Sequence, residues 1–388
     1  MFFETSARAI ELLRSRASAP VMTFRATGRH RGKALLLHKT APLVLGRVSR
    51  FDRHSNCAEV RNLVAVLREL GFDVTLVDRG CPEWSLPRGP FDVVVGLAAG
   101  NSGRLLPRLY EACPNALKLG YCAGPEPSWS NSAIEARYRH AYRLRGRQVP
   151  KEPMRVIDQY DFKSVFEQSD ALVVHGNSHT VSTYRKLLPN KQLFRVDGIA
   201  IGQPLFKLQC AGLRRGFLAV GGDGAIVKGI DLVVRAAIES PGSRFGYLGL
   251  LERDFRTLIG TEIEDAPNFR EHGFVYANSK RFASIADSYS FGLLPSCSEG
   301  MATSVLTMMR RGLVPMVTEE TGVDVEDFGI IVKTNHLLKD AVDLAEELDP
   351  RWLDRARTKA LLASSRYSKE NHRTGLSKAL SQILECSE

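Results

Sequence analysis

From Lys33 onward, short apolar runs alternate with longer stretches in which apolar residues recur at helical spacing. The runs typical of strands are Ala34–Leu37, Phe72–Val77, Phe91–Leu97, Ala116–Tyr121, Ala171–Val174 and Gln192–Val196. The stretches typical of helices are Asn56–Leu70, Arg104–Ala112, Asn131–Arg145, Asp161–Gln168 and Val181–Leu188. This alternation predicts an α/β domain built on a doubly wound parallel sheet.

The periodicity stops at Gly198–Arg215, where glycine and proline indicate a linker, and then a second α/β series begins. Its predicted strands are Gly216–Val220, Arg244–Leu248, Phe269–Gly273, Phe291–Leu294, Val314–Val317 and Gly329–Val332. Its predicted helices are Ile230–Ile238, Asp254–Gly260, Lys280–Ala286, Ala302–Arg311, Leu337–Leu348 and Trp352–Ser365. We therefore expect two Rossmann-like domains facing a cleft, an N-terminal one over 1–205 and a C-terminal one over 206–366.

A glycine-rich turn follows the first strand of the second series. The segment contains Gly221, Gly222, Gly224 and Lys228, and a helix begins directly after it. Backbone amides in such a turn can approach an anion, and a lysine at the helix start adds a point charge, so the segment indicates a phosphate site. The spacing fits neither the dinucleotide fingerprint nor a P-loop, and a tight turn with a solvated lysine is the alternative.

A second loop of small residues follows the strand Phe291–Leu294. Glu299 lies at its tip and can accept hydrogen bonds from sugar hydroxyls. The amides and hydroxyls over Gly300–Ser304 can bind a diphosphate at the start of the next helix. The alternative is that Ser298 and Glu299 only cap that helix.

These two segments together resemble the donor half of the retaining GT-B glycosyltransferases of the group 1 type. That family has a strand, a glycine turn and Lys-Gly, then Pro-Ser-x-x-Glu-Gly at a helix start and Gly-x-x-Pro before the next strand. The matching residues here are Gly221, Gly222, Lys228, Gly229, Pro295, Ser296, Glu299, Gly300, Gly312 and Pro315. The resemblance is specific over 216–332 and looser in the N-terminal half.

The resemblance implies a role for each matching residue. Lys228 would bind the donor diphosphate and Glu299 the transferred sugar, which makes these two the catalytic candidates. The other implied donor-side residues are Gly221, Gly222, Phe274 beside the base, Ser298, Gly300, Thr303, Ser304 and Thr307. The family needs neither a metal nor a cofactor, because the lysine and the helix dipole stabilise the leaving group. The segment 367–388 would pack back onto the N-terminal domain, as in relatives.

The sequence departs from the family pattern at two positions. Thr307 stands where a second glutamate usually holds the ribose hydroxyls, and the glycine turn lacks an arginine near Gly222. These departures motivate an alternative, a catalytically degenerate scaffold that binds nucleotide or glycan.

The N-terminal half is expected to bind the acceptor. His54 precedes a predicted helix and is a candidate contact, with a surface histidine as the alternative. Glu126 and Trp129 follow a strand and offer the carboxylate and aromatic face that a sugar ring binds, although Trp129 can equally anchor its loop. Arg137 belongs to a basic helix whose arginines fit an acidic glycan, a lipid-linked phosphate or an anionic bilayer, although a solvated face is favoured.

Composition narrows the location and the partners. The 388 residues include 44% hydrophobic ones, enough for two cores, and the apolar runs are too short to span a bilayer. Seven scattered cysteines indicate a reducing compartment without structural zinc, and the net charge of +10 favours anionic partners. Met1–Ser18 is expected to form a surface helix rather than a secretion signal.

The sequence thus predicts a cytoplasmic glycosyltransferase, with peripheral contact to the inner face of the membrane left open. It would move a sugar from a UDP- or GDP-sugar to a glycan or a lipid-linked saccharide, with retention. Nucleic acid is not expected as a partner, because the basic residues are spread along the chain.

Overall fold

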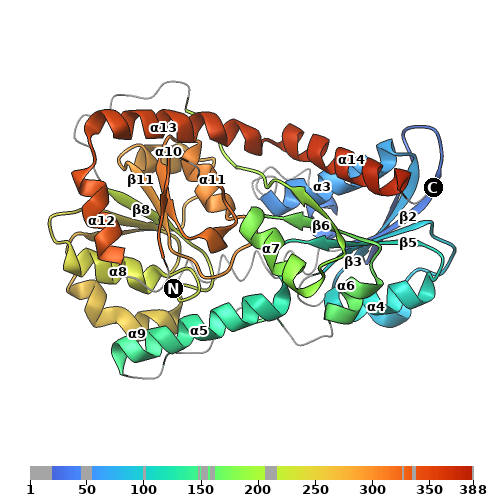
Figure 1. Cartoon of the computed structure of the whole chain (residues 1–388), viewed down its shortest axis with the longest axis horizontal. Coiled ribbons are helices and arrows are strands. Elements are labelled where there is room, and N and C mark those ends of the chain that lie inside the picture. Colours follow the sequence, from blue (N-terminus) through green and yellow to red (C-terminus); the bar gives the residue numbers. More distant parts are fainter. Residues whose placement is uncertain are drawn as a thin grey trace.

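The computed structural model describes residues 20–44, 55–98, 102–146, 149, 156–157, 162–205, 216–325, 327–333 and 338–386. The predicted helix at 1–18 and the candidate His54 lie outside these residues. Within them the chain forms two parallel sheets, each with helices on both faces, which lie side by side (Figure 1). The prediction of two doubly wound domains is confirmed.

The first sheet has seven strands in the order β1-β3-β2-β4-β5-β6-β7. Its strands are β1 Val21–Phe24, β2 Gly32–His38, β3 Phe72–Asp78, β4 Val93–Leu97, β5 Leu117–Cys122, β6 Ala171–His175 and β7 Gln192–Val196. All neighbours pair in parallel except β1, which runs antiparallel along β3 with Val21 opposite Val77. Strand β1, a short and only partly buried edge strand, was not predicted from the sequence.

The helices of the first half are α2 Ala41–Val44, α3 Ser55–Glu69, α4 Ser102–Ala112, α5 Pro127–Arg145, α6 Phe162–Gln168 and α7 Ser178–Leu187, with the 3-10 turn η1 Glu83–Ser85. Successive residues of β2 serve opposite faces of the sheet, as strand geometry requires. Leu36 packs in the core that α3 shares, whereas Leu35 and Leu37 pack in the core under α4 and α6.

The second sheet has six strands, all parallel, in the order β10-β9-β8-β11-β12-β13. They are β8 Phe217–Val220, β9 Phe245–Leu248, β10 Phe269–Gly273, β11 Phe291–Leu294, β12 Val314–Val317 and β13 Ile330–Ile331. The surrounding helices are α8 Ile230–Glu239, α9 Arg253–Glu264, α10 Lys280–Ala286, α11 Thr303–Met309, α12 Leu338–Glu347 and α13 Pro350–Ser364, with η2 Glu319–Thr321.

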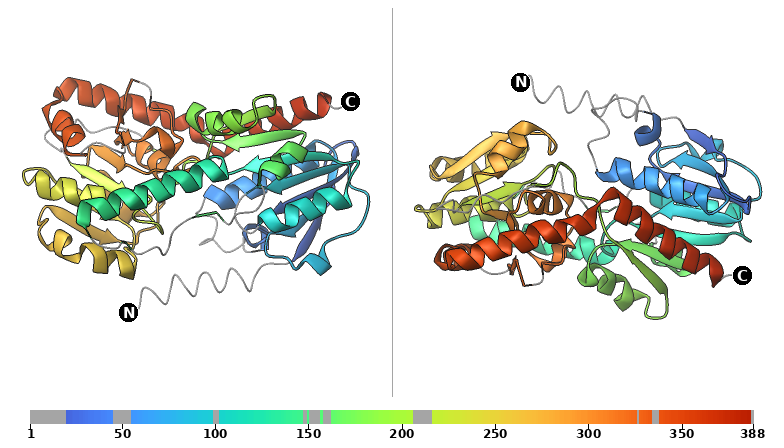
Figure 2. Two further views of the ribbon diagram at one scale, coloured as in Figure 1. Left: turned by 60° about the horizontal axis from the view of Figure 1, so that its bottom comes forward. Right: turned by 90° about the horizontal axis from the view of Figure 1, so that it is seen from above.

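The last two helices cross from one half to the other. Helix α13 packs against α11 and β12 of the second half. After η3 Ser365–Tyr367, helix α14 Lys369–Glu385 lies against α3 and β7 of the first half (Figure 2). Leu376 and Leu380 of α14 are fully buried in the core of the first sheet.

Helix α5 makes a second crossing, which the sequence analysis did not predict. It begins at Pro127, after β5 of the first sheet, and runs along the second half beside α9 (Figures 1 and 2). Ile134, Tyr138 and Ala141 are buried in the core of the second sheet. Helix α5 therefore belongs to the first half by sequence and to both halves by packing.

Buried charge accompanies this crossing. Asp231 at the start of α8 pairs with Arg137 and, at 3.1 Å, with Arg145, and the three side chains are 0%, 2% and 6% exposed. Arg145 also binds Glu262 of α9 at 2.8 Å. Asp231 thus contacts two arginines of a helix that comes from the other half, and Glu262 shares the second of them.

We predict that Asp231→Ala destabilises the protein by about 3–5 kcal/mol, because it leaves the buried guanidinium of Arg137 without its carboxylate and Arg145 with Glu262 alone. Urea unfolding followed by circular dichroism measures the change. The control is Glu135→Ala, which breaks the exposed pair with Arg139 and should cost no more than about 0.5 kcal/mol. Equal midpoints for the two variants would contradict the structural role of Asp231.

Candidate active site

The loops that follow the strands of the two sheets meet between the two halves. Ser55, at the start of α3, donates from its Oγ to Thr303 Oγ1 at 3.4 Å. Ser130 Oγ, in the first turn of α5, lies 2.7 Å from Ser298 Oγ. Since these residues lie in loops or first helical turns after parallel strands, the carboxyl ends of the two sheets face each other, where ligands bind in α/β folds.

Backbone packing at this junction explains two glycines. A Cβ on Gly300 would lie 2.0 Å from the carbonyl oxygen of Ala123, which belongs to the loop after β5. A Cβ on Gly322 would lie 1.6 Å from the carbonyl oxygen of Gly300, and Gly322 has a φ of 71°. The loop that carries Glu299 therefore packs so closely against the backbone of two other segments that a side chain at Gly300 or Gly322 would clash.

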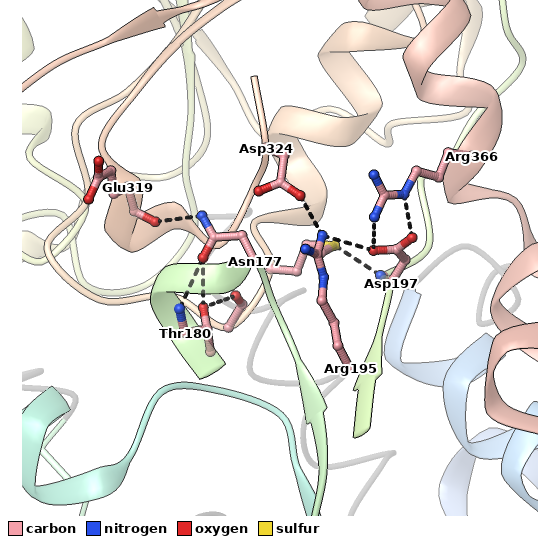
Figure 3. A network of polar contacts seen from close by, with 10 residues as sticks. Asn177, Thr180, Arg195, Asp197, Glu319, Asp324 and Arg366 are labelled. Atoms are coloured by element: carbon pink, nitrogen blue, oxygen red, sulfur yellow. Dashed lines mark hydrogen bonds and ion pairs between the residues drawn. The ribbon is translucent and has the colours of Figure 1, made fainter. Parts of the chain in front are cut away.

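Asn177 links the halves by a further contact (Figure 3). Its Oδ1 accepts from Thr180 N at 3.0 Å and so caps α7, while its Nδ2 donates to the carbonyl oxygen of Glu319 at 3.1 Å. Thr180 Oγ1 also donates to the Gly300 carbonyl oxygen at 3.4 Å. Asn177 therefore caps α7 and joins it to the second half through the same side chain.

An ion-pair network continues along β7 (Figure 3). Arg195 pairs with Asp324 of the second half and with Asp197 at 3.3 Å. Arg366 of η3 binds the same Asp197 at 2.5 Å. These contacts join the end of the first sheet to the start of α14.

Lys228 and Glu299 form an ion pair beside this junction. Lys228 Nζ lies 2.6 Å from Glu299 Oε1, and the side chains are 13% and 14% exposed. Their two loops follow β8 and β11, which are neighbouring strands. The Cys297 amide and Ser296 Oγ both donate to the Val227 carbonyl oxygen, at 2.9 and 3.1 Å, and hold the loops together. The structure therefore brings together the two residues that the sequence analysis names as catalytic.

The glycine turn runs alongside Lys228. A Cβ on Gly221 would lie 3.4 Å from Lys228 Cδ, so the lysine side chain follows the turn. Gly222 is exposed, and a Cβ there would meet nothing within 4 Å. The turn is thus open on one side.

A carboxylate of the protein occupies amides of this turn. Glu252 Oε1 accepts from the backbone nitrogen of Gly224, and from that of Ala225 at 3.3 Å. Amides here were expected to bind an anion, and in the structure that anion is a side chain from the loop after β9. No motif marks Glu252 in the sequence, because its contact depends on how β8 and β9 pair.

The start of α11 uses some of its polar groups within the protein. Thr307 is buried, donates from its Oγ1 to the Thr303 carbonyl oxygen at 2.7 Å, and accepts from Ile201 N at 3.2 Å. Ser304 is half-buried. The amides of Thr303 and Ser304 lie in the first turn of the helix, where no acceptor exists within the helix itself.

Phe274 lies in the loop after β10. It is 52% exposed, and its ring meets that of Tyr276 edge to face at 5.0 Å. An exposed aromatic face at the end of a strand can stack on a flat ring.

The acceptor-side candidates Glu126 and Trp129 both make contacts within the protein. Both oxygens of Glu126 cap α5, accepting from Ser128 N at 3.0 Å and Trp129 N at 2.8 Å. This cap, with Pro127 in the first position, explains why the helix begins earlier than the predicted Asn131. Trp129 is half-buried against the ring of His179.

Arg137 does not lie where the sequence analysis expected it. Its guanidinium is buried against Asp231 between the halves rather than at a surface that an acceptor could reach. Arg139 and Arg143 of the same helix are exposed.

No protein-family model and no curated protein matches the sequence. Among solved structures, sucrose-phosphate synthase from Thermosynechococcus elongatus matches 92% of this chain and 100% of its own length, with a TM-score of 0.60 and 14% identity. A point mutant of TarM from S. aureus, in complex with fondaparinux, alpha-GlcNAc-glycerol and UDP, matches 75% of this chain with a TM-score of 0.52 and 12% identity.

The chain has the GT-B fold.

The pneumococcal O-GlcNAc transferase GtfA, in complex with UDP and GlcNAc, also matches, over 75% of this chain with a TM-score of 0.50 and 15% identity. The match spans 55% of the length of the TarM mutant and 57% of GtfA. None of the described helices of this GT-B chain is both long and apolar enough to cross a membrane.

Under the carboxyl edge of the first GT-B sheet lies a buried polar cluster that the sequence analysis missed. His38 and His175 end β2 and β6 on the face that α3 and α14 cover, and both rings contact Tyr121. His372 of α14 packs on His175. Glu59 of α3 is also buried here, and it acts on Tyr121 electrostatically. No group of described residues, this one included, is arranged to hold a metal ion.

Burial shifts the pKa values of this cluster in opposite directions. Desolvation lowers the pKa of His38 to about 3 and that of His372 to about 4, and it holds the pKa of His175 well below its usual value. Desolvation raises the pKa of Glu59 to about 7. All four groups are therefore disposed to be neutral near pH 6.5 in the folded protein.

We predict that the protein loses stability as the pH falls from about 6.5 to 5, because the unfolded histidines bind protons that the folded ones do not. Each buried histidine contributes a slope of about 1.4 kcal/mol per pH unit. Glu59 acts in the opposite sense over this range, since it binds a proton on folding.

The test is urea unfolding at several pH values. His372→Gln should flatten the dependence of unfolding free energy on pH, and Glu59→Gln should steepen it. If both variants kept the wild-type slope, these groups would not be neutral in the folded state.

Proposed function

We propose that the protein is a glycosyltransferase that moves a sugar from a nucleotide-sugar to a glycan or lipid-linked saccharide. The observation that carries the proposal is the Lys228–Glu299 ion pair, held at 2.6 Å where the loops of two GT-B sheets meet. A nucleotide-sugar offers a partner to each residue of the pair. The anionic diphosphate can bind the lysine, and the sugar hydroxyls can donate to the carboxylate.

Donor binding would separate the two charges and give each a new partner. Lys228 Nζ would turn to the donor diphosphate, and Glu299 would accept from hydroxyls of the transferred sugar. Both side chains are mostly buried, so their interactions with a bound ligand are less screened than at the surface. The open side of the turn at Gly222 leaves room for the phosphates, and the exposed ring of Phe274 can stack on the base.

Chemically, the bond between the sugar anomeric carbon and the phosphate oxygen breaks, and the acceptor oxygen bonds to that carbon. In the retaining reaction that we propose, the acceptor attacks from the face that the phosphate leaves. The leaving phosphate oxygen takes the acceptor proton, and Lys228 stabilises the charge that remains on the diphosphate. No protein base, metal or cofactor is assigned to this reaction.

The comparisons support the choice of ligands. The TarM and GtfA structures contain UDP, and the GtfA structure also contains GlcNAc. We propose a UDP- or GDP-sugar as the donor and a cytoplasmic location. Exposed Arg139 and Arg143 on α5 offer a contact for an anionic acceptor or membrane surface.

A second candidate is a GT-B protein that binds nucleotide or glycan without catalysis. The Thr307 hydroxyl already has two protein partners, so it cannot replace a carboxylate that holds both ribose hydroxyls. Turnover separates this candidate from the first.

We predict that Lys228→Gln strongly reduces thermal stabilisation by the nucleotide that the wild-type protein binds. Loss of a charged contact to phosphate costs about 1.5–3 kcal/mol, which is about 10- to 100-fold in Kd. The measurement is a thermal shift screen against UDP, GDP, ADP and their common sugar conjugates, with Lys163→Ala, at an exposed lysine of α6, as the control.

Glu299→Gln is expected to retain nucleotide binding but to lower turnover by about 100-fold or more, because it weakens contacts to the sugar. Nucleotide binding without sugar transfer or donor hydrolysis in the wild-type protein would favour the second candidate. A Lys228→Gln variant that binds every nucleotide as the wild type does would contradict the proposed donor site.

A further inference from the structure

Glu252 stands at the N-cap of α9 but does not cap that helix. Its backbone is extended, with φ −59° and ψ 148°, and its side chain accepts no hydrogen bond from the first turn of α9. The carboxylate instead reaches the glycine turn and accepts from Gly224 N and Ala225 N. The Glu252 side chain therefore has two sets of backbone amides within reach. It binds those of the glycine turn and leaves those of the first turn of α9 uncapped.

The contact with the turn satisfies only half of the carboxylate. Oε1 accepts both hydrogen bonds, whereas Oε2 is buried and has no hydrogen-bond partner in the described part of the protein. No ion pair among the described residues involves Glu252 either. A buried carboxylate oxygen without a partner is costly, so this position of the side chain is less stable than a fully bonded one.

The amides that Glu252 occupies lie in the turn along which the Lys228 side chain runs. A carboxylate bound to these amides occupies the position in which such a turn can bind a phosphate. It also places a negative charge beside the region where Lys228 would receive the donor diphosphate.

We propose that Glu252 is a movable carboxylate that competes with the donor diphosphate for the glycine turn and so limits donor affinity. When the diphosphate enters, the side chain leaves Gly224 and Ala225 and caps α9. This inference rests on the proposed donor site, and it makes Glu252 a determinant of affinity for the phosphate part of the donor.

Two substitutions separate displacement from a simple effect of charge. Glu252→Ala removes the carboxylate and frees both amides. Glu252→Asp keeps the charge on a side chain one methylene shorter, which reaches the turn less well and is a preferred N-cap residue. Glu264→Ala removes the same charge from an exposed position of the same helix and is the matched control.

The experiment is isothermal titration of UDP and of GDP into the wild type and the three variants, with Lys228→Gln alongside. Both Glu252 variants are expected to bind the preferred nucleotide about fivefold to tenfold more tightly than the wild type, and Glu264→Ala to match the wild type. Nucleotide binding by the Glu252 variants but not by the wild type would support the same conclusion in a stronger form.

Unchanged or weaker binding by both Glu252 variants, with wild-type binding that depends on Lys228, would overturn this inference and leave the proposed function standing. Tighter binding by Glu252→Ala alone would show an effect of charge without displacement and would also overturn it. No binding by any form of the protein would contradict the proposed donor site as well.

Discussion

The structure depends on a buried carboxylate that joins the two halves. Asp231 has no exposed surface, and it pairs with Arg137 and Arg145 on a helix that starts in the other half. With α5 held in this way, the loop after β5 that precedes it lies against the loop of Glu299, and Gly300 meets the backbone of Ala123. The relative position of the two sheets, and hence the geometry of the site between them, follows from contacts that contain no catalytic group.

Much of the fold could be predicted from the sequence because most of the strands are buried on both faces and therefore appear as apolar runs. The strand β1 could not, since an edge strand with one antiparallel neighbour needs only weak patterning. The crossing of α5 was also hidden. The sequence pattern of a helix with apolar residues on one side is the same whether that side packs on its own sheet or on the next one. Arg137 looks like a surface residue in the sequence, because its buried partner Asp231 lies far away along the chain.

The donor side of the candidate site was predictable in part for a related reason. Lys228 and Glu299 each lie in a loop with its own local motif of small residues, so the sequence indicated both. Glu252 belongs to a third loop with no glycine signature, and only the order β9-β8-β11 brings it to the same turn. The cluster of His38, His175 and His372 joins residues far apart in the chain, and no local spacing connects them. What sequence reasoning missed consists of contacts that the sheet order and the returning helix create.

In the function that we propose, Lys228 and Glu299 form the donor site of this GT-B chain. The most direct test is a crystal structure of the protein with the nucleotide that stabilises it, soaked or co-crystallised. We expect a diphosphate oxygen within hydrogen-bonding distance of Lys228 Nζ, with the Lys228–Glu299 pair opened. A nucleotide bound elsewhere, with that ion pair intact, would contradict the proposed donor site.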